Sequence, residues 1–465
     1  MMAIDVNPQD PHSWTIQVNN RTIFTIFSPN DTLNKSIQIE GEEGSLFNFN
    51  ATQVDKYGDL IGYVTIRIPV NLIEKGMAAK FKIIGESAGS STWFMIYKYK
   101  TIERFKIQAE NAIRKGSKNN ERVVKLEIVY YKEGAKAEIQ LGNQRIFQSL
   151  NYGYNRSFVT FDADTSEKTL SYAVSVDGKI LDEGEITIKP IKQMTIYLIH
   201  HSHVDIGFTH IQTEVEEKQW GYIEQCISLA ESSLSYPKEA QFKWNIEVMW
   251  ALDSYWKKCN PEQKDRLKIA IQKNWIELDA FYGNELTGLC SSEELMYLMS
   301  SAREIAKECS VELTAAMISD IPGWSWGIVP ALSQSGVKYL SLGTNTFHRI
   351  GYTIEEWGDK PFYWQSASGK EKVLTWIHAK GYSSFHTGLG AENIVNKLDE
   401  EILLTYMNEL RDKEYPYEKV ILRYNIGSDN GPPDVMLSEK VKNWNERYIS
   451  PKLVISTTSA AFSAF

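Results

Sequence analysis

The spacing of apolar residues changes near residue 193, and this change limits the folds that the chain can adopt. Before it, apolar and polar residues alternate in short runs, such as Trp14-Thr-Ile-Gln-Val and Glu185-Ile-Thr-Ile-Lys. After it, short apolar runs are separated by longer segments in which apolar residues recur at helical spacing. Alternation is typical of antiparallel strands with one buried face, whereas strand–helix repeats are typical of parallel sheets. The sequence therefore predicts two domains, 1–192 and 193–465.

The first of these regions is expected to be a β-rich accessory region of one or two antiparallel sandwich-like modules, because its runs are bounded by turn residues such as Asp177-Gly178. The second is expected to form a barrel, since its strand–helix units repeat roughly seven times. The predicted fold class is therefore α/β: a (β/α) barrel of roughly seven strands preceded by an antiparallel β-sandwich-like region.

Composition excludes several classes of function. The net charge of −9, without any strongly basic stretch, argues against nucleic acid as the main partner. No apolar run approaches the roughly 20 residues of a membrane span, and the amino terminus lacks the features of a secretion signal. We therefore expect a cytoplasmic protein, or a secreted or periplasmic one if its signal lies outside this sequence. The four cysteines are too widely spaced for a zinc knuckle or a redox pair and are expected to be reduced.

The stretch from Tyr197 to His210 holds four of the eight histidines and follows an apolar run that reads as a buried strand. Within it, His203 and Asp205 lie two residues apart, so their side chains point to the same side of an extended segment. An imidazole and a carboxylate that converge in this way suit zinc or another divalent metal. The alternative is a histidine cluster that only satisfies local backbone groups, and a His-x-Asp pair also occurs by chance.

Further polar residues stand at the ends of other predicted strands. They are Asn284, Glu285, Asp320, His378, Asp429 and Asn430. In a β/α barrel the carboxyl ends of all strands meet at one face, where catalytic groups gather. We therefore expect these side chains to lie near the histidine cluster.

With these residues placed, the second region resembles the amino-terminal catalytic barrel of the glycoside hydrolase family 38 α-mannosidases. That family carries a His-Ser-His-x-Asp-x-Gly-Trp segment, and this chain has His201-Ser-His-Val-Asp-Ile-Gly-Phe208. The similarity continues in order over residues 196 to about 460. It includes Phe242 to Trp256, Asp320-Ile-Pro-Gly, Ser335-Gly-Val, Phe362 to Gly369 and Gly427-Ser-Asp429.

This resemblance implies a metal-dependent hydrolase that acts on α-mannosides or related glycans and retains the anomeric configuration. It implies His203 and Asp205 as ligands of Zn²⁺ or another divalent metal. Retention requires one carboxylate as the nucleophile and a second carboxyl group as acid and then base, about 5 Å apart. The resemblance also implies carboxy-terminal domains beyond residue 465, which would supply the remaining zinc histidine and complete the site.

The chain departs from the family pattern at both catalytic carboxylates. The family nucleophile lies in a Gly-Gly-x-Trp-x-x-x-Asp stretch, where this chain reads Asp279 to Thr287 without an aspartate at that place, and Glu285 is the nearest candidate nucleophile or ligand. The family acid lies in a segment that Tyr382-Ser-Ser-Phe-His386 matches only at its edges. Asp320 or His386 is therefore the candidate acid. The candidate substrate-binding residues are Tyr282, Trp324 and Asp429.

Two alternatives remain open from the sequence. A metal-dependent carbohydrate deacetylase can also use a β/α barrel with histidine and aspartate ligands. A non-catalytic carbohydrate-binding protein would keep a vestigial metal site and use indole rings to stack on sugars. Its candidate stacking residues are Trp324, Trp326, Trp357 and Trp364.

Overall fold

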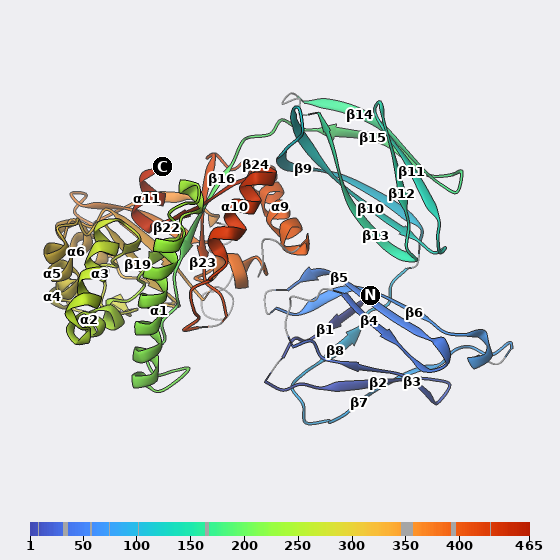
Figure 1. The fold of residues 1–465 in the computed structure, drawn as a ribbon, viewed down its shortest axis with the longest axis horizontal. Helices are drawn as coiled ribbons and strands as arrows, with labels where there is room; N and C mark the ends of the chain where they lie inside the picture. The colour runs from blue at the N-terminus through green and yellow to red at the C-terminus, as the bar shows by residue number, and fades with distance from the viewer. Residues whose placement is uncertain are drawn as a thin grey trace. The chain divides into compact units, whose positions relative to one another are not determined.

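The computed structural model describes residues 1–7, 9–30, 36–55, 58–73, 75–100, 102–162, 167–345, 357–391, 397–427 and 429–465. The chain forms two compact units (Figure 1). The first unit comprises Met1–Lys192 and Gly390–Glu414, and the second unit comprises Gln193–Leu389 and Tyr415–Phe465.

The first unit begins with a sandwich-like module of two antiparallel sheets. The five-stranded sheet has the order β4 (Ser36–Glu40), β5 (Leu46–Val54), β6 (Leu60–Arg67), β1 (Met2–Ile4) and β8 (Phe94–Ile96). The three-stranded sheet has the order β3 (Arg21–Phe27), β2 (Ser13–Val18) and β7 (Phe81–Gly85). Alternate side chains such as Ile16 on β2 and Phe49 on β5 fill one shared core.

A second sandwich-like module follows in the same unit. One sheet has the order β12 (Gln144–Ser149), β11 (Lys136–Leu141), β14 (Lys168–Val176) and β15 (Lys179–Ile188). The other contains β13 (Gly153–Asp162), β10 (Asn120–Tyr130) and β9 (Arg104–Lys115). Asp177 and Gly178 join β14 to β15 with φ of 48° and 78°, because a tight hairpin turn requires positive φ at both positions. The predicted antiparallel, sandwich-like region is confirmed.

The first unit also contains α9 (Lys397–Asp412), which packs against β9. Asn408 Oδ1 accepts a hydrogen bond from Asn111 N at 2.7 Å. Glu401 pairs with Lys125 at 3.1 Å, and the same ammonium lies 3.9 Å from Glu110. Buried ion pairs therefore attach this helix to the second sandwich module.

The second unit contains three pieces of parallel sheet. In the first piece β16 (Thr195–His200) lies between β23 (Lys419–Tyr424) and β25 (Lys452–Ser456). The second piece pairs β17 (Trp244–Asn245) with β18 (Ile276–Glu277). The third has the order β19 (Ala315–Ser319), β20 (Tyr339–Gly343), β22 (Lys372–His378) and the antiparallel β21 (Pro361–Gln365). A further short strand, β24, spans Tyr448–Ser450.

Helices connect and cover these strands. They are α1 (Gln212–Ser232), α2 (Met249–Lys258), α3 (Pro261–Gln272), α4 (Ser292–Tyr297), α5 (Ser300–Cys309), α6 (Ile328–Gln334), α10 (Leu437–Arg447) and α11 (Thr458–Ser463). The local sequence explains several boundaries. Asn260 and Gln263 form a reciprocal capping box at the start of α3, with Pro261 at the first helical position. Among the described residues, no helix is long and apolar enough to cross a membrane.

The segment from Ser291 to Cys309 forms two helices rather than one, with Ser291 as the N-cap of the first. One expectation differs from the structure. Among the described residues the hydrogen-bonded strands form separate pieces, so a closed (β/α) barrel is not observed as one continuous sheet. The two-residue lengths of β17 and β18 explain why, since such short strands make few ladder bonds.

Candidate active site

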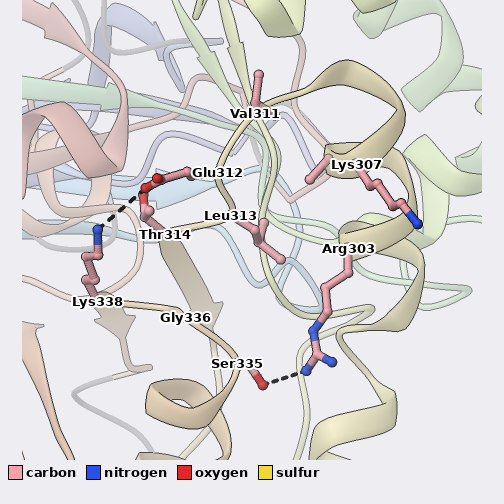
Figure 2. Close-up of a pocket in the computed structure, with 10 residues that line it drawn as sticks. Arg303, Lys307, Val311, Glu312, Leu313, Thr314, Ser335, Gly336 and Lys338 are labelled. Carbon is pink, nitrogen blue, oxygen red and sulfur yellow. Dashed lines mark hydrogen bonds and ion pairs between the residues drawn. The ribbon is translucent and has the colours of Figure 1, made fainter.

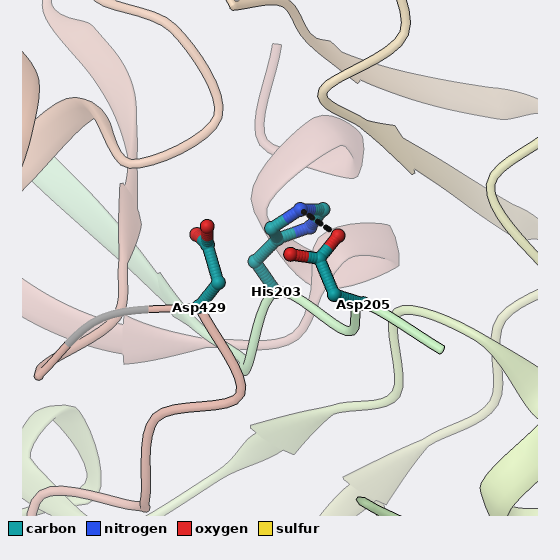
Figure 3. A group of neighbouring side chains, drawn as sticks. All are labelled: His203, Asp205 and Asp429. Atoms are coloured by element: carbon teal, nitrogen blue, oxygen red, sulfur yellow. Dashed lines mark ion pairs between the residues drawn. The ribbon is translucent and has the colours of Figure 1, made fainter. Parts of the chain in front are cut away.

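His203, Asp205 and Asp429 converge on one point in the second unit (Figure 3). One ligand atom from each residue lies within 4.8 Å of the other two. His203 Nε2 is 3.3 Å from Asp205 Oδ1. The imidazole is buried, and the two aspartates are partly exposed. An imidazole nitrogen and two carboxylates in this arrangement are suitable donors for a divalent cation.

The register of the parallel strands brings these three residues together. β16 and β23 are neighbours, with His200 opposite Tyr424 at their last positions. Because parallel strands end at the same edge of a sheet, the two following loops leave the sheet side by side. The first loop carries His203 and Asp205, and the second carries Asp429.

Asn430 ties the two loops together. Its backbone N–H donates to His203 O at 2.6 Å, and its side-chain amide donates to Asp205 O at 2.9 Å and to Thr209 Oγ1 at 2.8 Å. Its φ of 58° lies in the left-handed region, which asparagine tolerates better than most residues. This residue therefore fixes the position of Asp429 relative to the histidine loop.

Glu247, which follows β17, is buried behind the site and binds its histidine. His203 Nδ1 lies 2.8 Å from Glu247 Oε1, and His201 Nδ1 lies 2.7 Å from Oε2. Ser319 Oγ donates to Oε2 at 2.6 Å, and Asn284 Nδ2 donates to Oε1 at 2.9 Å. The carboxylate thus joins the loops that follow β16 and β18 to the last residue of β19.

The electrostatics of the site favour positive charge. Burial lowers the pKa of His203, but the charge of Glu247 and the hydrogen bonds with Asp205 and Glu247 outweigh it and raise that pKa to about 10. Burial acts to raise the pKa of Glu247, yet the charge of His203 and the imidazole hydrogen bonds hold it well below its usual range. Burial raises the pKa of Asp429; His203 opposes this and the charge of Asp205 adds to it. The carboxylates therefore stabilise a cation at this point.

The same residues fit a bound metal ion. His203 Nε2 is buried and faces the carboxylate of Asp205, with Oδ1 at 3.3 Å. A divalent cation would satisfy this nitrogen and offset the repulsion between Asp205 and Asp429, which lie on either side of it. The predicted pair His203 and Asp205 is thus joined by Asp429, which the sequence suggested as a substrate-binding residue.

Asp320 and Tyr382 border this group. Tyr382 OH donates to Asp429 Oδ1 at 3.2 Å, and its ring centroid is 4.5 Å from that of His203. Burial raises the pKa of Tyr382, and the charges of Asp429 and Asp320 raise it further. Asp320 Oδ1 is buried without a hydrogen bond to a described residue, and its backbone φ is 58°. Asp320 thus lies beside the group formed by His203, Asp205 and Asp429, and its catalytic role stays a prediction.

Glu285 lies on a loop that is anchored at both sides. Asn284 Oδ1 accepts a hydrogen bond from Ser319 N at 2.8 Å, and Thr287 Oγ1 accepts one from Ser325 N at 2.8 Å. Glu285 lies between these two anchors and is partly exposed. Its loop is therefore held against the loop that carries Asp320.

Two other predicted site residues lie in different surroundings. The His386 ring packs on Tyr424, with centroids 4.5 Å apart. Tyr282 accepts a hydrogen bond from Trp250 N at 2.9 Å through its carbonyl, and its hydroxyl bonds with Asp253. Neither belongs to the group formed by His203 and the two aspartates. Their catalytic and substrate-binding roles stay predictions.

The predicted stacking tryptophans differ in exposure. Trp324 packs against the core around β19 and β20 and is only partly exposed. Trp326 is 63 % exposed and meets Trp364 edge-on, with centroids 6.1 Å apart. Trp357 stacks on Phe362 at 5.0 Å. The two more exposed rings, those of Trp326 and Trp357, thus each contact an aromatic ring of β21.

The sequence analysis gave no role to Glu247. A signal was present, because Glu247 stands two residues after the buried strand β17 and between buried residues. A charged residue in such a place needs a partner. Its partners come from two separate loops and from the end of β19, however, and no local pattern identifies them.

The second unit also has an open hollow of about 460 Å³ away from these residues (Figure 2). It lies where Thr314 and Lys338 precede β19 and β20. Arg303 donates to Ser335 Oγ at 2.5 Å, and Lys338 pairs with Glu312 at 3.5 Å across it. Ligands of parallel sheets bind beyond the carboxyl ends of the strands. This hollow is at the amino ends and is therefore not the candidate active site.

Comparison with known families identifies the second region. The model for the glycosyl hydrolases family 38 N-terminal domain matches residues 193–465. No curated protein sequence matches the chain significantly.

Several solved structures are similar in part. An α-mannosidase from Enterococcus faecalis V583 has 17 % identity and a TM-score of 0.47, over 58 % of this chain and 29 % of that one. A family 38 glycosyl hydrolase from Enterococcus faecalis has 14 % identity and a TM-score of 0.42, over 59 % and 27 %. A 4-α-glucanotransferase from Thermococcus litoralis has 14 % identity and a TM-score of 0.39, over 59 % and 40 %. The chain thus spans under a third of the length of the first two.

Proposed function

This chain belongs to glycoside hydrolase family 38, and from that premise we propose that it is a metal-dependent glycosidase that cleaves α-mannosides or related glycans with retention of configuration. The observation that supports this most directly is the convergence of an imidazole nitrogen of His203 with the carboxylates of Asp205 and Asp429 within 4.8 Å. Zn²⁺ or another divalent cation is the proposed cofactor, and a glycan is the proposed substrate.

His203, Asp205 and Asp429 would hold the cation. When bound, it would act as a Lewis acid and template toward sugar hydroxyl groups. Tyr382 would keep Asp429 oriented, since its hydroxyl donates to that carboxylate at 3.2 Å. Asn430 would keep the two ligand loops in register through its bonds to both.

We propose Glu285 and Asp320 as the pair of catalytic carboxyl groups. Asp320 would protonate the leaving glycosidic oxygen while the carboxylate of Glu285 attacks the anomeric carbon; Asp320 would then take a proton from the water that releases the sugar. Support for Asp320 comes from its buried, unbonded Oδ1 and its charge near Asp429. Support for Glu285 comes from the anchored loop beside it. His386 remains the alternative acid.

The test is hydrolysis of 4-nitrophenyl α-mannoside by the chain loaded with one equivalent of Zn²⁺. We expect nitrophenol release, loss of activity after dialysis against a chelator, and an α-anomeric first product by NMR. His203→Ala should reduce kcat/KM at least about 100-fold, because it removes a metal ligand. Tyr282→Phe, a change outside the metal group, is the matched control and should leave the metal content unchanged.

Other outcomes would replace this proposal. Metal-dependent release of acetate from an acetylated sugar, without nitrophenol release, would select the deacetylase alternative. Binding of mannosides without turnover, in a chain that takes up no metal, would select the carbohydrate-binding alternative. In that case single changes of the exposed Trp326 should weaken binding, because its ring would be the stacking surface.

A further inference from the structure

We infer that Glu247 is a positioning residue that forces His203 to carry its proton on Nδ1, so that Nε2 is the atom offered to the metal. The inference rests on the proposed metal site and adds a residue that does not itself touch the cation.

Both carboxylate oxygens of Glu247 accept hydrogen bonds from neighbouring groups. Oε1 accepts hydrogen bonds from His203 Nδ1 at 2.8 Å, from Val204 N at 3.2 Å and from Asn284 Nδ2 at 2.9 Å. Oε2 accepts one from Ser319 Oγ at 2.6 Å and also lies 2.7 Å from a nitrogen of His201. A carboxylate offers about four lone-pair positions. Glu247 is therefore saturated and does not serve as a metal ligand.

The pairing with His203 settles which nitrogen is available. An ionised carboxylate only accepts hydrogen bonds, so the nitrogen that faces it must be protonated. In a neutral imidazole that places the proton on Nδ1 and leaves the lone pair on Nε2. Nε2 is the nitrogen that lies 3.3 Å from Asp205 Oδ1. The nitrogen that would carry the lone pair thus faces Asp205, one of the two proposed carboxylate ligands.

The surroundings of Glu247 also hold the ring in this orientation. Ser319 is itself bound by Arg423 Nη1 at 2.5 Å, and Arg423 Nη2 donates to Ser341 O at 2.7 Å. Ser319, Ser341 and Arg423 are all buried, and they belong to the strands β19, β20 and β23. The imidazole is therefore held through Glu247 by a hydrogen-bond network that reaches three strands.

Glu247→Gln is the sharpest test, because every polar group around this side chain is a donor. The amide NH₂ of glutamine would face at least one of these donors. If it faces His203, it would favour protonation of Nε2 and so block the ligand atom. Mutation of a residue that orients a ligating histidine without touching the metal typically lowers metal affinity about 10- to 100-fold. We expect a loss of that size for Zn²⁺, measured by competition with a chromogenic chelator.

Glu277→Gln is the matched control. Glu277 lies on the neighbouring strand β18, opposite Asn245, and its carboxylate accepts a hydrogen bond from Ser459 N at 3.1 Å. The same chemical change there leaves His203 untouched, so the Zn²⁺ affinity should stay within about threefold of that of the unchanged chain, below the range typical of orienting residues. Thermal unfolding of both variants without metal shows whether each one folds.

A second measurement needs no variant. In the Zn²⁺-loaded chain, long-range ¹H–¹⁵N NMR of the histidine rings should show His203 with a protonated Nδ1 and a metal-bound Nε2. Metal bound through Nδ1 would overturn the inference, as would a folded Glu247→Gln chain with unchanged Zn²⁺ affinity. Failure of the unchanged chain to bind Zn²⁺ would instead refute the proposed metal site itself.

Discussion

At the scale of single residues, the proposed metal ion would compete with a proton for one nitrogen of His203. The carboxylates that raise the pKa of His203 to about 10 are the groups that would attract a divalent cation. A cation that binds Nε2 must displace the proton from it. Metal uptake should therefore release protons and become stronger as pH rises through the neutral range.

The proton on His203 also makes the stability of the metal-free chain depend on pH. Because the folded pKa, about 10, is above the unfolded value of about 6.5, the stabilisation is complete below pH 6.5 and is lost as pH rises toward 10. We expect the free energy of unfolding, measured in urea, to fall by up to about 1.4 kcal/mol per pH unit in this window relative to His203→Asn.

Saturating Zn²⁺ provides the control for this prediction. The metal-bound imidazole carries no proton on Nε2, so the pH-dependent difference between the unchanged chain and His203→Asn should shrink. Equal pH slopes for the two metal-free chains would show that His203 is not protonated in the folded state.

Sequence reasoning identified His203 and Asp205 because the pair is local: two residues at the end of an apolar strand. Asp429 was found as a polar residue at a strand end, but its place beside the histidine depends on the pairing of β16 with β23. Glu247 received no role, since its proposed function follows from contacts with two other loops and with the end of β19. Long-range contacts of this kind depend on tertiary packing, and the spacing of apolar residues in the sequence does not predict them.

At the scale of elements, helices and parallel strands followed from local patterns. α3, for example, begins at Pro261, a residue type that favours the first position of a helix. No proline or glycine lies near Tyr297 that would predict the interruption between α4 and α5. The closed barrel remains a prediction, since strand–helix repeats indicate a parallel sheet but not its closure.

The loop after β23 is the element whose position matters most for the site, and Asn430 is its anchor. Asn430→Ala removes the side-chain bonds to Asp205 O and Thr209 Oγ1 and places alanine at a φ of 58°. We expect a loss of about 2–3 kcal/mol in the free energy of unfolding, from two hydrogen bonds and left-handed strain. Zn²⁺ affinity should fall as well, because Asp429 is adjacent.

Asn430→Gly separates these two causes. Glycine tolerates the left-handed backbone, so this variant should lose the hydrogen bonds but avoid the strain. Its unfolding free energy should be higher than that of the alanine variant by about 1 kcal/mol, with a similar loss of Zn²⁺ affinity. Unchanged affinity in both variants would refute the anchoring role of Asn430.

At the scale of the whole molecule, the division of the chain is not sequential. Residues 390–414 belong to the first unit although they interrupt the sequence of the second. No change of composition or periodicity marks this segment, because α9 is amphipathic like the helices around it. Buried ion pairs with β9 and β10 hold this segment in the first unit, and these contacts can be tested.

Lys125→Met tests whether those ion pairs hold α9 in place. The ammonium is 8 % exposed and serves both Glu401 and Glu110, so its removal leaves two buried carboxylates with less compensation. Breaking a buried pair in this way costs about 3–5 kcal/mol. Hydrogen exchange measured by mass spectrometry should therefore show faster exchange in peptides from α9 and β10, while peptides from β16 and β19 keep their protection.

Lys106→Met is the control for this prediction. It breaks a 3.6 Å ion pair of a lysine whose side chain is 63 % exposed, and it should lower the free energy of unfolding by under about 1 kcal/mol. Equal losses of stability and of exchange protection in the two variants would show that the ion pairs of Lys125 do not hold α9 in place.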